Sequence, residues 1–166
     1  MKLVSPQNVL AVPKHFEFAL HHAKGDYVGF LTDKMIVLPD LLNANARVIN
    51  SGDDVDIVNY LYHSYVVDDY TQPGGSGKLI LSKSLPSPVA YEINPIDELK
   101  KKSSGGISRS NQTKLSYLTG KICFGFYSIK LINQIIRNTG ELFGGVTHDY
   151  SSMVQGLILA RRVLVL

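Results

Sequence analysis

The chain has 166 residues, of which 45% are hydrophobic and 19% are charged. This length predicts a single domain that buries most of its apolar surface, and the composition is typical of a folded soluble protein. The formal net charge of +3 favours a phosphate-bearing ligand, but it is too small to indicate nucleic acid as the partner.

The residue pattern predicts neither a disulfide framework nor a membrane-spanning segment. Cys123 is the only cysteine, and its apolar neighbours predict a buried thiol and a cytoplasmic protein. Pro6 and the polar residues after it interrupt the apolar core that a signal peptide needs. The apolar residues 163–166 fall well short of the ~20 of a spanning helix. They predict a buried strand and a chain that normally continues past it.

Helical and strand patterns alternate along the first half of the chain. Apolar residues at helical spacing predict a helix over 13–23, with Gly25 as its stop signal. Short apolar runs predict the strands, and Pro39 marks the start of a second helix. The further predicted elements are a strand at 27–31, the helix at 39–50, one or two strands within 56–67, a turn or mobile loop at 72–77 and a strand at 78–81.

The second half continues this alternation. Ser128 is predicted to cap a helix that Gly140 ends. The other predicted elements are a short helix at 95–102, a polar segment without a period to residue 119, a strand at 121–126, a helix at 150–160 and the terminal strand. Strands alternating with helices predict one α/β domain over residues 1–166, with a largely parallel sheet flanked by helices.

Two polar groups stand where such a sheet would bind a ligand. In open α/β sheets, ligands bind beyond the carboxyl ends of the strands. Thr32, Asp33 and Lys34 directly follow the predicted strand 27–31, and residues 147–152 directly precede the last helix. Asp33 fits an ordinary turn as well as a ligand site. Asp149 fits a helix cap as well as a catalytic group.

The residues around these groups resemble one enzyme family. Residues 23–31 (AKGDYVGFL), with the following Thr32-Asp33-Lys34 and Pro39, resemble the middle of family-2 glycosyltransferases. Residues 123–128, 140–143 and 148–152 are similar, more loosely, to the acceptor side of the same fold. The resemblance implies the GT-A fold, the fold of nucleotide-diphospho-sugar transferases. Members of this family begin with a further strand, helix and strand, so it also implies a chain that is incomplete at its N-terminus.

The resemblance implies a function as well. An inverting glycosyltransferase of this kind moves a sugar from a nucleoside diphosphate sugar to a hydroxyl of a saccharide or lipid-linked acceptor. The family's usual setting is polysaccharide biosynthesis, in the cytoplasm or at the inner face of the membrane. Asp149 matches the catalytic base, which removes the proton of the attacking hydroxyl. Thr32, Asp33 and Lys34 match the donor-binding cluster, in which Asp33 would bind Mn²⁺ or Mg²⁺.

The donor cluster departs from the family's D-x-D pattern. When Pro39 is aligned, Thr32 and Lys34 occupy the two carboxylate positions and Asp33 occupies the variable one. A metal clamp made of two carboxylates is therefore absent. The Lys34 ammonium could contact the diphosphate instead and supply the positive charge that a metal would bring.

Two other function classes fit the sequence. One is a non-catalytic or truncated remnant of such an enzyme that acts as a binding module. The other is a nucleotidyltransferase, whose Gly-rich nucleotide loop the chain lacks. The basic stretch formed by Lys100–Lys102, Arg109 and Lys114 is typical of a solvated loop. The histidines lack metal-ligand spacing, so a zinc site is not predicted.

Overall fold

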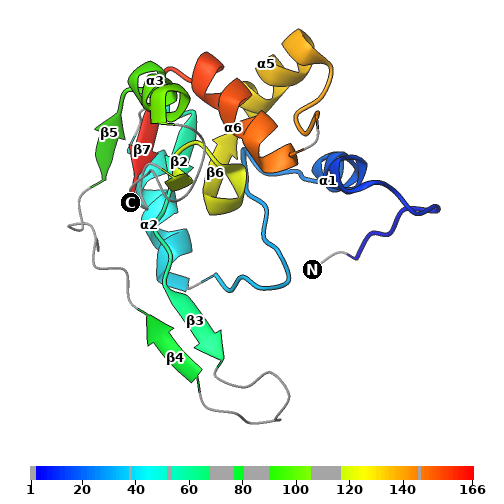
Figure 1. The fold of residues 1–166 in the computed structure, drawn as a ribbon, viewed down its shortest axis with the longest axis horizontal. Helices are drawn as coiled ribbons and strands as arrows, with labels where there is room; N and C mark the ends of the chain where they lie inside the picture. The colour runs from blue at the N-terminus through cyan, green and yellow to red at the C-terminus, as the bar shows by residue number, and fades with distance from the viewer. Residues whose placement is uncertain are drawn as a thin grey trace.

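A computed structural model describes residues 3–37, 39–51, 54–67, 77–80, 90–105, 117–145 and 147–166. Figure 1 shows how the elements are arranged. In chain order they are α1 (Val12–Leu20), β1 (Tyr27–Val28), α2 (Pro39–Ile49), β2 (Ile57–Asn59), β3 (Ser64–Val67), β4 (Gly77–Ile80), β5 (Tyr91–Ile93), α3 (Pro95–Gly105), the 3₁₀ helix η2 (Ile122–Phe124), β6 (Gly125–Ser128), α5 (Ile129–Thr139), α6 (His148–Leu159) and β7 (Val163–Val165).

The central sheet has five strands in the order β1-β6-β2-β7-β5. Among the neighbouring strands only β2 and β7 pair in parallel, while β6 is antiparallel to both of its neighbours and β5 is antiparallel to β7. The prediction of a mixed helix-and-strand domain is confirmed, but the prediction of a largely parallel sheet is wrong. A short apolar run marks a buried strand without fixing its direction, and β6 inserts between β1 and β2 in the opposite sense.

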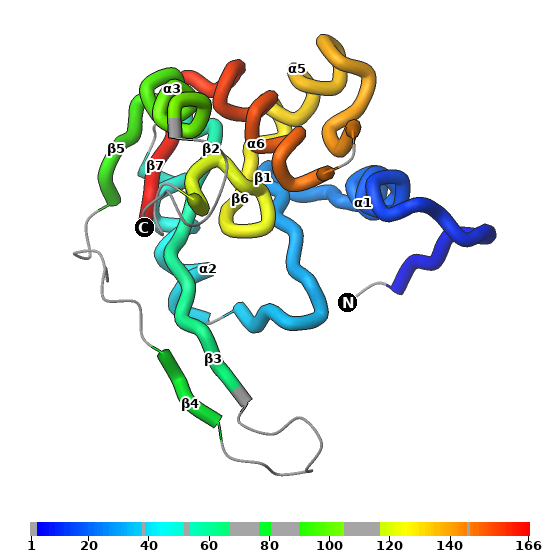
Figure 2. The backbone as a smooth tube through the Cα atoms, in the orientation of Figure 1, coloured from blue at the N-terminus to red at the C-terminus, as the bar shows by residue number. Residues whose placement is uncertain are grey.

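The terminal strand lies inside the sheet rather than at its edge. β7 pairs with both β2 and β5, and its three residues are buried. Figure 2 shows β7, in red, between these two strands. Ile57 and Val163 pack into the cluster that contains α5 and α6, whereas Val58 and Leu164 pack near Val48 of α2. Helices therefore cover both faces of the sheet, as the sequence pattern predicted.

Several boundaries in the structure differ from the predicted ones. Only the first two residues of the predicted strand 27–31 form a strand, and the first part of the predicted strand 121–126 forms the helix η2. α1 ends at Leu20, so Gly25 does not cap it. β5 was not predicted. The region 56–67 forms two strands, the second of which pairs antiparallel with β4, and this pair projects from the main sheet (Figure 1). Residues 72–76, Arg109 and Lys114 lie outside the described residues.

The caps of α5 are as predicted. The Ser128 hydroxyl accepts a hydrogen bond from the Leu131 backbone N–H at 3.2 Å. Gly140 ends the helix with a φ of 85°, a left-handed conformation that glycine adopts without steric cost. These two ends fix the helix whose buried residues, Leu131, Ile132 and Ile135, form much of the core.

Tyr127 ties β6 to α6. Its ring is fully buried, and its hydroxyl lies within hydrogen-bond distance of the carbonyl oxygens of Gly120 and Ser152. Burial raises the pKa of Tyr127, so the phenol stays protonated and can donate. Gly156 of α6 lets the ring approach, because a Cβ at that position would lie 2.4 Å from the Tyr127 hydroxyl oxygen.

We therefore expect Gly156→Ala to destabilise the fold. Alanine favours a helix over glycine by about 1 kcal/mol. Forcing a methyl group against a buried ring should nevertheless leave a net loss of about 1–3 kcal/mol in the free energy of unfolding. Urea denaturation measures this loss. Asn133→Ala, on the exposed face of α5, is the control and should change stability by less than about 0.5 kcal/mol. Equal stability of both variants would show that Tyr127 is not packed as described.

Candidate functional site

The Thr32–Lys34 segment forms a tight exposed turn after β1. The Met35 backbone N–H donates to the Thr32 carbonyl oxygen at 3.1 Å. The Lys34 backbone N–H donates to the Thr32 hydroxyl at 3.4 Å. All three side chains of the segment are exposed. The turn thus presents a hydroxyl, a carboxylate and an ammonium group to solvent.

Asp149 lies in the first turn of α6, but it is not the N-cap. Thr147 occupies that position, and its side chain makes no capping hydrogen bond. A carboxylate in the first helical turn still benefits from the positive end of the helix dipole. The Asp149 side chain is 29% exposed. Asp149 therefore does not occupy the N-cap position that the sequence left open for it.

Thr32 and Asp149, far apart in the sequence, line the same cavity. This inner cavity has a volume of about 320 Å³. Its lining residues are Phe16, Phe30, Thr32, Met35, Tyr117, Ile122, Cys123, Phe124, Phe143, His148 and Asp149. The fold thus brings together two of the residues that the sequence proposed for the site.

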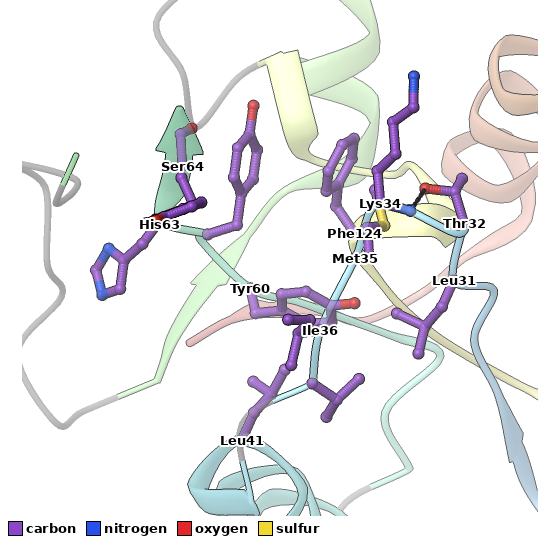
Figure 3. A pocket seen from close by; sticks show the side chains of 13 residues that line it. Leu31, Thr32, Lys34, Met35, Ile36, Leu41, Tyr60, His63, Ser64 and Phe124 are labelled. Atoms are coloured by element: carbon purple, nitrogen blue, oxygen red, sulfur yellow. Dashed lines mark hydrogen bonds between the residues drawn. The ribbon is translucent and has the colours of Figure 1, made fainter. Parts of the chain in front are cut away.

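A second cavity of about 390 Å³ adjoins the first, because Thr32, Met35 and Phe124 line both. The remaining walls of this outer cavity come from Leu31, Lys34, Ile36, Val37, Leu41, Tyr60, Tyr62, His63, Ser64 and Tyr65. Figure 3 shows the Lys34 side chain extending away from Leu41 and Tyr60. Asp33 lines neither cavity. Within this turn, Lys34 therefore lines only the outer cavity, whereas Thr32 lines both cavities.

Aromatic rings form the wall of the inner cavity beside Asp149. The Phe16 ring stacks on the His148 ring with centroids 4.4 Å apart, and it also contacts Phe30 and Phe143. The buried Glu17 carboxylate accepts a hydrogen bond from the Phe143 backbone N–H at 2.6 Å. These contacts fix α1 against the start of α6. No sequence pattern predicted these contacts, because the residues of each pair are distant in the chain.

Aromatic side chains also line the outer cavity. The rings of Tyr62 and Phe124 stack with centroids 5.0 Å apart and planes 17° apart. Burial raises the pKa of Tyr60 to about 12, with a smaller contribution from Cys123, so its phenol is neutral at physiological pH. Flat apolar faces with a few polar groups are typical of sites for organic ligands.

Asn59 fixes the segment that joins the two cavities. This β2 residue is buried, and its amide nitrogen donates to the carbonyl oxygens of Lys121 and Phe124 at 3.2 and 3.1 Å. Its amide oxygen accepts a hydrogen bond from the Gly120 backbone N–H at 2.9 Å. The Lys121 and Phe124 carbonyl oxygens also accept from the backbone N–H groups of Phe124 and Tyr60, so the Gly120 N–H is the group that depends on Asn59 for its partner.

Charged groups meet behind the inner cavity. The Lys121 ammonium lies 3.4 Å from a carboxylate oxygen of Asp149. Burial raises the pKa of Cys123 to about 11, and Asp149 adds to this rise, so the thiol is protonated at neutral pH and is not a nucleophile as it stands. The prediction of a buried thiol is only approximately met, since Cys123 is half-buried and lines the cavity.

The donor groups at the turn do not fit a protein-held metal clamp. Asp33 is the only carboxylate of the Thr32–Lys34 turn. Across the part of the chain that the structure describes, no three His, Cys, Asp or Glu side chains gather as a metal site. Mg²⁺ and Mn²⁺ take oxygen ligands in near-octahedral sets, of which a single exposed carboxylate supplies little. The binding of a divalent ion by Asp33 stays a prediction.

Comparison with known proteins adds no relative. The chain matches no protein-family model, no curated protein and no solved structure. Among the described residues, none of the helices has the length and apolar character needed to cross a membrane. The residues of the site are therefore the basis for a proposed function.

We expect Asn59→Ala to destabilise the protein at the segment that Asn59 holds between the two cavities. The variant removes the acceptor of the buried Gly120 N–H, and a buried donor left without a partner costs about 1–3 kcal/mol, so the unfolding free energy should fall by about that amount. Chemical denaturation measures the loss. Asn43→Ala on the exposed face of α2 is the matched control and should be nearly neutral. A neutral effect of Asn59→Ala would mean that water or a rearranged loop replaces these hydrogen bonds.

Proposed function

We propose that the chain is a nucleotide-sugar-dependent glycosyltransferase of the GT-A, family-2-like kind. It would transfer a sugar, with inversion, from a nucleoside diphosphate sugar to a hydroxyl group of a saccharide or lipid-linked acceptor. The observation that supports this proposal best is that Asp149 and Thr32 line one cavity of about 320 Å³. In this proposal the reaction takes place in the cytoplasm or at the inner face of a membrane, and nucleic acid has no part in it.

In this proposal Asp149 is the general base. Its carboxylate would accept the proton of the acceptor hydroxyl while the hydroxyl oxygen attacks the anomeric carbon of the donor. The bond from that carbon to the diphosphate oxygen breaks on the opposite face, and the diphosphate leaves with the electron pair. A single displacement of this kind inverts the anomeric carbon, so one carboxylate base suffices.

The Thr32–Lys34 turn would hold the diphosphate. Diphosphate departure builds negative charge, which a nearby ammonium group stabilises. Lys34 is exposed at the outer cavity and Thr32 lines both cavities, so the turn would contact phosphate oxygens next to Asp149. The aromatic walls would exclude water from the reacting carbon and so limit hydrolysis of the donor.

A non-catalytic binding module is the alternative function. It is favoured by the position of Asp33, which lines neither cavity, and by the absence of a second carboxylate in the turn. Such a module would bind a nucleoside diphosphate sugar without turning it over. Binding and turnover therefore have to be measured separately.

The first test is turnover of a panel of uridine, guanosine and thymidine diphosphate sugars, followed as release of the nucleoside diphosphate with mixed saccharide acceptors. We expect one donor to be consumed. Asp149→Asn, which keeps the shape but loses the base, should lower kcat by about 10²–10⁴-fold with donor binding retained. Asp97→Asn, an exposed carboxylate on α3, is the matched control and should retain full activity. Donor binding without turnover by the wild-type protein would favour the binding module.

The second test concerns the turn. Lys34→Ala should raise the Kd of the nucleoside diphosphate by about tenfold, the equivalent of about 1.4 kcal/mol. The effect should shrink in high salt, because an exposed ammonium is screened. Isothermal titration calorimetry measures the Kd. Lys24→Ala, an exposed lysine before β1, should bind as the wild-type protein does. An unchanged Kd in Lys34→Ala would remove Lys34 from the donor site.

A further inference from the structure

The buried residue Lys121 forms an ion pair with Asp149. The Lys121 side chain is only 1% exposed, and its ammonium nitrogen lies 3.4 Å from Asp149 Oδ2. The same nitrogen lies 3.7 Å from the centroid of the Tyr117 ring and 4.0 Å from that of Tyr150. The cation is therefore enclosed by one carboxylate and two aromatic faces, which attract it through their quadrupoles.

The backbone of Lys121 is held at both of its polar groups. Its carbonyl oxygen accepts a hydrogen bond from the Asn59 amide, and its N–H donates to the Leu118 carbonyl oxygen at 3.0 Å. Asn59 belongs to the central sheet, so the stem of the lysine starts from a fixed point. Because the backbone of Lys121 is fixed and its ammonium group is enclosed by two rings, the ammonium group has little freedom to move toward solvent.

The surroundings keep this group charged. Burial alone, the largest single effect, lowers the pKa of Lys121. Tyr117, Asp149 and Tyr150 together outweigh burial, and the net shift is upward. Among the described residues, Cys123 and Lys102 also interact electrostatically with Lys121. A permanent cation therefore sits beside a carboxylate that lines the inner cavity.

We propose that Lys121 is a positioning residue that sets the orientation of the Asp149 carboxylate in the inner cavity. This inference rests on the proposed function, because orientation matters only if Asp149 acts as the base. A free carboxylate rotates about its side-chain torsions, whereas one held by a fixed cation presents the same geometry to each acceptor. A misplacement of about 1 Å in a catalytic group can cost about 10²-fold in rate.

A second buried lysine supplies the control. Lys102 is 2% exposed and lies 3.6 Å from the buried Glu98 carboxylate, within α3. It shares the burial and the ion pair of Lys121, but neither it nor Glu98 lines either cavity. Its replacement therefore measures what the loss of a buried lysine does to stability alone.

The first arm of the test needs no activity. The Lys121 ammonium is titrated by NMR of lysine-labelled protein in the wild type, in Asp149→Asn and in Asp54→Asn, which replaces an exposed carboxylate paired with Lys130. Because Asp149 raises the pKa of Lys121, the midpoint should fall in Asp149→Asn and stay unchanged in Asp54→Asn. An unchanged midpoint in Asp149→Asn overturns the ion pair and the inference, whatever reaction the protein performs.

The second arm is kinetic. Lys121→Met should lower kcat by about 10²-fold with little change in KM, and Lys121→Arg should recover part of the loss, because a cation is restored. Lys102→Met should lose comparable stability but keep kcat. Equal kcat losses in Lys121→Met and Lys102→Met would reduce Lys121 to a structural role. A wild-type protein that turns over no donor overturns the proposed function and the positioning role with it, while the NMR arm still decides whether the pair exists.

Discussion

The structure depends on satisfying the polar backbone between Gly120 and Phe124 inside the protein. This segment contains the short helix η2 and forms no strand, so its backbone hydrogen bonds are irregular and the Gly120 N–H finds its partner in a side chain. Asn59 supplies three hydrogen bonds from the sheet, and the Tyr127 hydroxyl reaches the Gly120 carbonyl. Because both partners are buried side chains on β2 and β6, the irregular segment is as fixed as the strands themselves. These hydrogen bonds therefore also fix the position of Cys123, which lines the inner cavity.

The same constraint explains where the cavities form. β6 starts only after η2, so the chain turns across the end of β2 before it enters the sheet. The turn after β1 comes from the neighbouring edge strand, and Phe124 of η2 lies between the two spaces that result. α1 then closes the inner cavity through its aromatic contacts with the start of α6. The site is thus assembled from segments that only the sheet order brings together.

The sequence predicted those parts of the fold that depend on local chemistry. Ser128 and Gly140 were recognisable because a cap and a left-handed glycine are local signals, and both are confirmed. Strand direction was not recognisable, since an apolar run reads the same either way. For the site, Thr32, Lys34 and Asp149 could be named from their place at element ends. Lys121 and Asn59 could not, because a lysine or an asparagine inside an apolar run carries no sign of a partner far away in the chain.

A role in stability alone is a poor explanation for the burial of Lys121. A buried ion pair is weak evidence for stability, because desolvation of both charges offsets much of their attraction, and an apolar pair of similar size often serves as well. The Lys102–Glu98 pair belongs to a helix that covers the core, so a packing role accounts for it. The Lys121–Asp149 pair differs, because one partner reaches a cavity and is partly exposed there. The Lys121 charge is costly to bury, and its partner Asp149 lines the inner cavity. A ligand that enters this cavity explains the ion pair better than the stability of the fold does.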